Sequence, residues 1–222
     1  MEKSLSGSTH FRLMKLPLWP TVAVLVIVYA VGVVGLYLEE TQALFMALTP
    51  LNLAVSAILL FAFHRHWNKA FFTFFIVTYL VGLGIEMLGT NTGWPFGAYT
   101  YGASLGTKVV GTPLMIGLNW LILVYATGAI SRKLPIIRLG RAVLGGLLMV
   151  MLDIVLEPVA IQLDFWTWEA TEVPIANYIA WFVIAFALHV LYQMLKFRKS
   201  NQLAPALYIV MLLFFTTLNF LL

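Results

Sequence analysis

Long apolar runs separated by short polar segments make up most of this chain. Seven such runs follow one another, and each is long enough for a helix that crosses a bilayer. They cover about residues 17–38, 43–63, 70–88, 112–130, 142–161, 174–195 and 203–222. The pattern predicts an all-α integral membrane protein, a bundle of seven transmembrane helices in one domain over residues 17–222. A polar, basic tail at residues 1–16 precedes it.

Composition supports the membrane assignment and removes one class of chemistry. Hydrophobic residues make up 62% of the 222 residues and charged residues only 10%, whereas soluble proteins carry roughly 25% charged residues. The lipid bilayer is therefore an expected partner. The chain has no cysteine, which excludes disulfides and thiolate metal sites.

The basic residues indicate how the helices are oriented. With the N-terminus on the inside, seven spans place twelve of the thirteen Lys and Arg residues on that side, and Lys108 is the exception. This is the bias that cytoplasmic loops show. We expect a multi-pass protein of the cell membrane with a cytoplasmic N-terminus and an external C-terminus. Because the basic residues sit in short loops, we expect no nucleic-acid partner.

Two carboxylates interrupt the fifth apolar run. Asp153 and Glu157 are four residues apart, so they lie on one face of a helix, one turn apart. A charge at membrane depth costs at least about 2.5–3.5 kcal/mol, which makes such acids candidates for a functional site. Pro158 cannot donate to the carbonyl of Ile154. We therefore expect the helix to end or kink beside Glu157. The alternative is a helix end at the membrane interface with Glu157 solvated.

Other polar and aromatic residues converge on the same depth. Glu86 lies near the end of the third run, a short acidic turn at residues 39–40 follows the first, and an aromatic loop spans residues 93–101. In the alternating topology, the polar residues and tryptophans singled out within the apolar runs all lie in the outer half of the membrane. They are Glu86, Asn119, Trp120, Asp153, Glu157, Asn177 and Trp181. This predicts one cavity that opens toward the outer leaflet. For Trp94, Tyr99, Tyr101, Trp166 and Trp168 the alternative is the aromatic belt of the membrane interface.

The sequence lacks several motifs of known chemistry. It has no Asp-rich diphosphate-binding run and no Gly-rich nucleotide fingerprint, and its four histidines are scattered. The seventh run has no lysine for a retinal Schiff base. We therefore expect no cofactor and no metal. The remaining chemistry needs an acid, water and an apolar cavity: protonation of an isolated double bond gives a carbocation that aromatic faces stabilise.

Three groups of motifs resemble one family. The first is Glu86 with Gly89-Thr90-Asn91-Thr92-Gly93 nearby and then residues 95–101. The second is residues 111–114 with Asn119-Trp120. The third is residues 153–158 with 166–168 and 174–178. Together they resemble the membrane carotenoid 1,2-hydratases, which include the bisanhydrobacterioruberin and gamma-carotene 1',2'-hydratases. The resemblance covers about residues 80–182.

The resemblance implies hydration of the acyclic psi end of a carotenoid such as lycopene or gamma-carotene, without a cofactor. The product would be a tertiary alcohol, and other carotenoid-pathway enzymes are possible partners. The same cation could instead be captured by a double bond, so a carotene cyclase is an alternative. A membrane transporter is another, although its path would need polar residues at all depths and the inner half looks almost purely apolar.

The resemblance leaves the roles of the acids open. Asp153 lies deeper than Glu157, so desolvation should keep Asp153 protonated as the acid, with Glu157 as the ionised base. Glu86 would support the pair or replace the base. We expect residues 93–102 to cap the cavity, helped by Pro95, Gly97 and Gly102. The expected substrate-binding residues are Trp94, Phe96, Tyr99, Tyr101, Asn119, Trp120, Trp166, Trp168, Asn177 and Trp181.

Overall fold

The structure, a computed structural model, describes residues 16–222, so all but the last residue of the expected tail at 1–16 lies outside the described part. Within it, six helices are long and apolar enough to cross a membrane. They are α1 (Leu18–Tyr37), α4 (Lys69–Thr92), α5 (Leu114–Ser131), α6 (Arg138–Gln162), α7 (Ile175–Met194) and α8 (Ala204–Leu221). The prediction of a helical membrane bundle is confirmed.

The second predicted run is a broken span. It forms α2 (Glu39–Ala47) and α3 (Thr49–Ala62), whose axes differ by 55°. Counted as one span, the pair brings the number to seven. Pro50 lies in the first turn of α3, where its missing N–H costs no hydrogen bond. The expected acidic turn at Glu39 and Glu40 is instead the first turn of α2, where the helix dipole favours acids.

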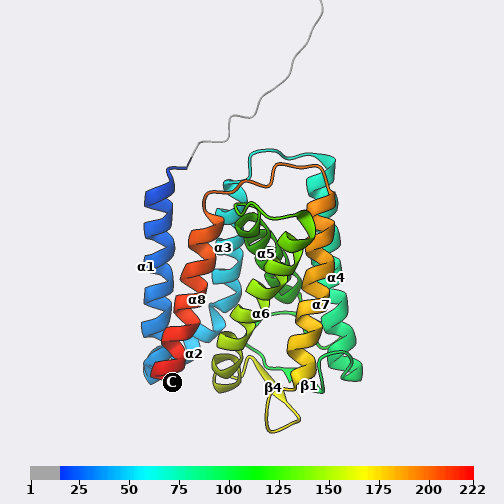
Figure 1. Cartoon of the computed structure of the whole chain (residues 1–222). Coiled ribbons are helices and arrows are strands. Elements are labelled where there is room, and N and C mark those ends of the chain that lie inside the picture. The colour runs from blue at the N-terminus through cyan, green and yellow to red at the C-terminus, as the bar shows by residue number, and fades with distance from the viewer. Residues whose placement is uncertain (1–15) are drawn as a thin grey trace, which may run out of the picture.

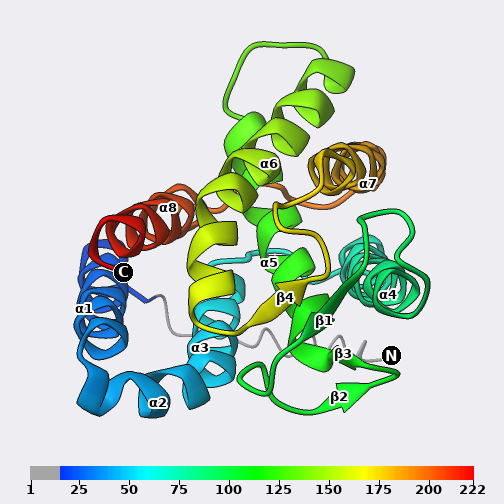
Figure 2. The ribbon, with the colours of Figure 1, turned by 90° about the horizontal axis from the view of Figure 1, so that it is seen from below.

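Helix α5 occupies the centre of the bundle. It packs against α3, α4, α6, α7 and α8, and more of it is buried than of any other span within the described residues. Helix α1 lies at the periphery against α8 (Figures 1 and 2). Gly82 of α4 lets α5 approach closely, since a Cβ there would lie 2.5 Å from the Cβ of Trp120. Small residues commonly permit such contacts between membrane helices.

Four short strands, which the sequence did not indicate, close one end of the bundle. β1 (Tyr99–Tyr101) pairs with β4 (Trp166–Trp168) in antiparallel fashion, and β2 (Lys108–Val109) pairs with β3 (Thr112–Pro113). The fourth run, expected from Thr112, therefore begins as a strand and becomes helical at Leu114. The loop after α4 and the loop after α6 form a single cap, drawn at the lower end in Figure 1.

Helix α6 does not end at Glu157, as Pro158 had suggested. It continues to Gln162 with Pro158 inside it. Val159 and Ala160 are fully buried beyond the proline, and the backbone N–H of Leu163 still bonds the carbonyl of Val159 at 2.9 Å. Tertiary packing thus holds the last turn despite the hydrogen bond that proline removes.

The opposite end of the bundle is less apolar than the sequence suggested. His64, in the α3–α4 connection, bonds the hydroxyl of Tyr125 at 2.7 Å. Buried His189 bonds the hydroxyl of Thr127 at 2.8 Å. These groups satisfy one another in pairs, as buried polar groups usually do.

Candidate active site

Three buried carboxylates lie at the end of the bundle that the strands close. Glu86 comes from α4, and Asp153 and Glu157 come from α6. Their exposed fractions are 3%, 1% and 2%. The alternative of a solvated Glu157 is therefore wrong. Exposure does not distinguish Asp153 from Glu157, and the expected difference in membrane depth stays a prediction.

Glu86 accepts three hydrogen bonds from aromatic side chains. The hydroxyls of Tyr99 and Tyr101 donate to its Oε2 at 2.5 and 2.7 Å. The indole N–H of Trp120 donates to Oε1 at 3.0 Å. Hydrogen bonds of this kind favour the ionised form of a carboxyl group. The two tyrosines reach Glu86 together because residues two apart on a strand point to the same face.

The two phenols remain donors at ordinary pH. Burial raises the pKa of Tyr99 above its usual value of 10, and the Glu86 carboxylate raises it further. Burial and Glu86 raise the pKa of Tyr101 in the same way. Both hydroxyls therefore keep their protons and direct them at Glu86.

Strand β4 supplies hydrogen-bond donors to Glu157, as its partner β1 does to Glu86. Trp166 lies opposite Tyr101 and Trp168 opposite Tyr99 in the register. Both indole N–H groups donate to Oε2 of Glu157 at 3.0 Å. A cap of two strands thus supplies donors to two carboxylates on different helices.

Asn177 of α7 connects the two carboxyl groups of α6. Its amide nitrogen donates to Oδ2 of Asp153 at 2.9 Å and to Oε1 of Glu157 at 3.4 Å. The other oxygen of Asp153, Oδ1, is buried without a hydrogen-bond partner among the described residues. Asp153 is therefore the carboxyl group with the fewest donors to stabilise a negative charge.

A small cavity of about 30 Å³ lies among these groups. A buried water needs roughly 10–15 Å³ of such volume, so the cavity has room for about one or two waters. Trp120 and Trp181 stack in its wall with ring centroids 4.5 Å apart. Asp153 does not line it. The lining residues are Glu86, Tyr99, Tyr101, Ile116, Asn119, Trp120, Leu156, Glu157, Trp166, Trp168, Asn177 and Trp181.

The structure brings together all but two of the expected substrate-binding residues. Trp94 does not line the cavity: its side chain is 65% exposed, as a residue of the interfacial belt would be. Phe96 is buried behind the cavity wall, where its ring packs against that of Tyr99 at 6.1 Å. The sequence analysis missed Ile116 and Leu156. Helical spacing could have found them, since each lies three residues from Asn119 or Asp153.

The arrangement suits acid–base chemistry on an apolar molecule. It offers carboxyl groups in different hydrogen-bonding environments, aromatic faces and room for water. Within residues 16–222, no group of three or more His, Asp or Glu side chains is placed to hold a metal ion.

Comparison with known proteins places the chain in a family. The family model described as "Carotenoid biosynthesis protein" matches residues 22–222. The chain belongs to the carotenoid biosynthesis protein family. Its six long apolar helices make it a membrane member of that family. No solved structure matches the chain.

A curated relative of this carotenoid biosynthesis protein carries a more specific name. The bisanhydrobacterioruberin hydratase of Haloarcula japonica is 34% identical over 116 residues. The match covers 46% of this chain and 38% of the relative, so the chain matches well under half of that protein. The resemblance to carotenoid hydratases that the motifs indicated is thereby confirmed.

Proposed function

We propose that this protein hydrates a carotenoid, adding water across the terminal 1,2 double bond of an acyclic psi end group. The observation that carries the proposal is the water-sized cavity between Glu86 and Glu157, walled by aromatic rings. Membership of the carotenoid biosynthesis family and the similarity to a protein named as a hydratase support it. In this proposal the site needs no cofactor.

The proposed reaction has two steps. A carboxylic acid gives its proton to C2 of the double bond, and the π electrons form the new C–H bond. The positive charge then resides on C1, which bears two methyl groups. Water bonds to C1 and loses a proton to a carboxylate, which leaves a tertiary alcohol. Aromatic faces near the cation contribute about 0.5–2 kcal/mol each, and the stacked Trp120 and Trp181 present such faces.

Asp153 is the proposed acid. Among the described residues, Glu86 and Glu157 each accept hydrogen bonds on both oxygens, whereas Asp153 accepts one and its Oδ1 has no partner. The proton is therefore most stable on Asp153. Leu156, which lines the cavity, lies three residues after Asp153 and one before Glu157. A double bond against Leu156 would thus lie beside Asp153, its neighbour one turn away on α6, and near Glu157, the next residue in the chain.

Glu157 is the proposed base. It lines the cavity, so it can accept the proton that the water releases. The pair then holds its single proton again, and return of that proton from Glu157 to Asp153 restores the starting state. Glu86 accepts hydrogen bonds from three donors, which favour its charged form, and as an anion it would stabilise the cation electrostatically.

Space for water distinguishes hydration from ring closure. A dry site would leave the cation to a neighbouring double bond, as in a cyclase. Here Asn119 and Asn177 join the carboxylates in lining a cavity that fits about one or two waters. Hydration is therefore favoured over cyclisation.

The decisive test is expression in a host that makes lycopene or gamma-carotene. Extracted pigment should contain a product heavier by one water, and an Asp153→Asn variant present at the same folded level should yield about 10²–10⁴-fold less of it. A product of unchanged mass with a ring at the psi end would show that the activity is cyclisation and not hydration. Unchanged pigment in the presence of folded protein would contradict both activities.

A further inference from the structure

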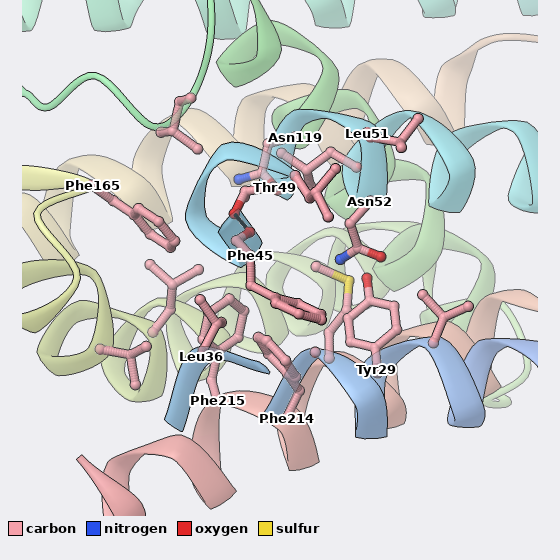
Figure 3. A pocket seen from close by; sticks show the side chains of 18 of the residues that line it. Tyr29, Leu36, Phe45, Thr49, Leu51, Asn52, Asn119, Phe165, Phe214 and Phe215 are labelled. Carbon is pink, nitrogen blue, oxygen red and sulfur yellow. Dashed lines mark hydrogen bonds between the residues drawn. The ribbon is translucent and has the colours of Figure 1, made fainter. Parts of the chain in front are cut away.

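A second and much larger pocket lies beside the carboxylate cavity. It has a volume of about 430 Å³ and an almost wholly apolar wall. Helices α1, α2, α3 and α8 form most of this wall (Figure 3). Phe45, Phe214 and Phe215 place their rings around it, and Tyr29 and Asn52 lie on the α1 and α3 sides.

The two spaces share a wall. Ile116, Asn119, Leu156 and Trp166 line both of them. These four side chains lie between the apolar pocket and the small cavity that Glu86 and Glu157 line. Asn119 makes no side-chain hydrogen bond with another described residue, so its amide is available to a ligand at this junction. We call these four residues the neck.

The far side of the pocket opens on the surface of the bundle. Ile27 and Val31 of α1 and Leu51 of α3 line the pocket, yet more than half of each side chain is exposed. In a membrane-spanning bundle such apolar surface faces lipid. The pocket therefore connects the acyl-chain region with the neck.

We propose that this pocket seats the acyclic isoprenoid end of the carotenoid, with its terminal double bond at the neck. This deepens the proposed function and rests on it. An apolar chain from the bilayer enters between α1 and α3, so the long polyene stays in lipid while its end reaches the carboxyl groups. Water occupies the small cavity on the other side of the neck. The two reactants thus meet from opposite sides at Leu156 and Asn119.

The geometry also assigns a selectivity to the pocket. A slender acyclic end passes into a pocket between helices more readily than a bulky substituted ring does, because overpacking a well-packed site is destabilising. The occupant is therefore an acyclic end group, and a carotenoid with rings at both ends is excluded. A phospholipid acyl chain is the competing occupant.

Blocking the entrance tests the proposal. Leu51→Trp fills the mouth, whereas Ile58→Trp makes the same kind of change on the lipid-facing surface of α3, outside the pocket lining. We expect Leu51→Trp to lower both copurified lycopene and hydrated product about tenfold. Ile58→Trp should match the wild type in both. The amount of folded protein is measured for each variant.

Two readouts separate this proposal from the proposed function. Lycopene that copurifies with the wild type but not with Leu51→Trp supports binding of the carotenoid end in this pocket, which we call the seat. If no hydrated product forms in that case, only the hydratase proposal fails. Hydration that continues at the wild-type rate in Leu51→Trp overturns the seat and leaves the hydratase proposal standing. Equal retention of lycopene and a dicyclic carotene, or retention of phospholipid alone, also overturns the seat.

Discussion

A single amide holds the two carboxyl groups of α6 in one arrangement. Asn177 has two N–H bonds, and one hydrogen-bonds each carboxyl group. An unsatisfied buried polar group costs about 1–3 kcal/mol, so changes of shape here would disturb folding as well as chemistry. Exchange of a carboxyl group for its amide keeps the shape and removes the acidic proton. Such exchanges therefore test chemistry more cleanly than truncations do.

The first prediction concerns Asp153→Asn. The variant cannot donate an acidic proton, so hydration should fall by about 10²–10⁴-fold, the usual contribution of a general acid. Bound carotenoid should remain near the wild-type amount. The measurement is hydrated product per folded protein in a carotenoid-producing host. If Asp153→Asn keeps near-normal hydration while Glu86→Gln loses it, Glu86 is the acid instead.

The second prediction concerns the phenol of Tyr99. Tyr99→Phe keeps the ring that packs against Trp168 at 5.0 Å and removes the hydroxyl that donates to Glu86. A less stabilised Glu86 anion should lower turnover about tenfold, the effect of roughly 1.4 kcal/mol. Tyr37→Phe, at a half-exposed position far along α1, is the matched control. A parallel drop in folded protein would show that the hydroxyl serves stability only.

At the level of elements, apolar runs predicted the helices well but not the cap. A run of about twenty apolar residues is a strong local signal, because the bilayer requires internally bonded backbone. β1 and β4 are three residues each, and their central pair, Thr100 with Thr167, is 67 positions apart in the sequence. No local pattern reveals such a pairing. The roles of Tyr99, Tyr101, Trp166 and Trp168 as donors to carboxylates depended on it.

Proline and acidic residues also gave predictions about helix ends that the structure corrects. Pro158 predicted that the helix ends or kinks, and the end is wrong because packing continues α6 to Gln162. Glu39-Glu40 predicted a turn, but these residues begin α2. Both signals are local, whereas the outcome depends on neighbouring elements. The carboxylates of α4 and α6 were nonetheless identified from the sequence, because charge within an apolar run is unusual wherever the helix packs.

The third prediction tests the cap. Gly102 follows β1, and its backbone N–H bonds the carbonyl of Phe165 at 2.9 Å. A Cβ at Gly102 would lie 1.8 Å from the backbone carbonyl oxygen of Asp164, so Gly102→Ala must displace β1 from β4. Hydration should be lost, because Glu86 and Glu157 would together lose the donors that β1 and β4 supply.

Gly84→Ala is the control for the cap prediction. No atom lies within 4 Å of a Cβ built at Gly84 in α4. Alanine also favours a helix over glycine by up to about 1 kcal/mol. This variant should be at least as stable as the wild type in a thermal melt and fully active. Equal activity in the two variants would mean that the site does not need the β1–β4 pairing.

At the scale of the whole molecule, charge and chemistry lie at opposite ends. The connections α5–α6 and α7–α8 lie at one end of the bundle and β1 and β4 at the other (Figure 1). The first end carries Arg132, Lys133, Lys196, Arg198 and Lys199. The two properties were inferred independently, the orientation from loop charge and the site from buried carboxylates. From the two together we propose a site toward the outer leaflet of the cell membrane.

The last prediction tests this orientation. Loops rich in Lys and Arg stay in the cytoplasm, so a reporter fused after Lys133 or Lys199 should give a cytoplasmic signal. Thr167 is exposed at the centre of β4, which allows a short tag there without filling the site. That tag should be accessible from outside intact cells. A tag at Thr167 that becomes accessible only after cell lysis would show the opposite orientation, with the carboxylates toward the cytoplasm. The chemistry of the site would stand, but water would then reach it from the cytoplasmic side.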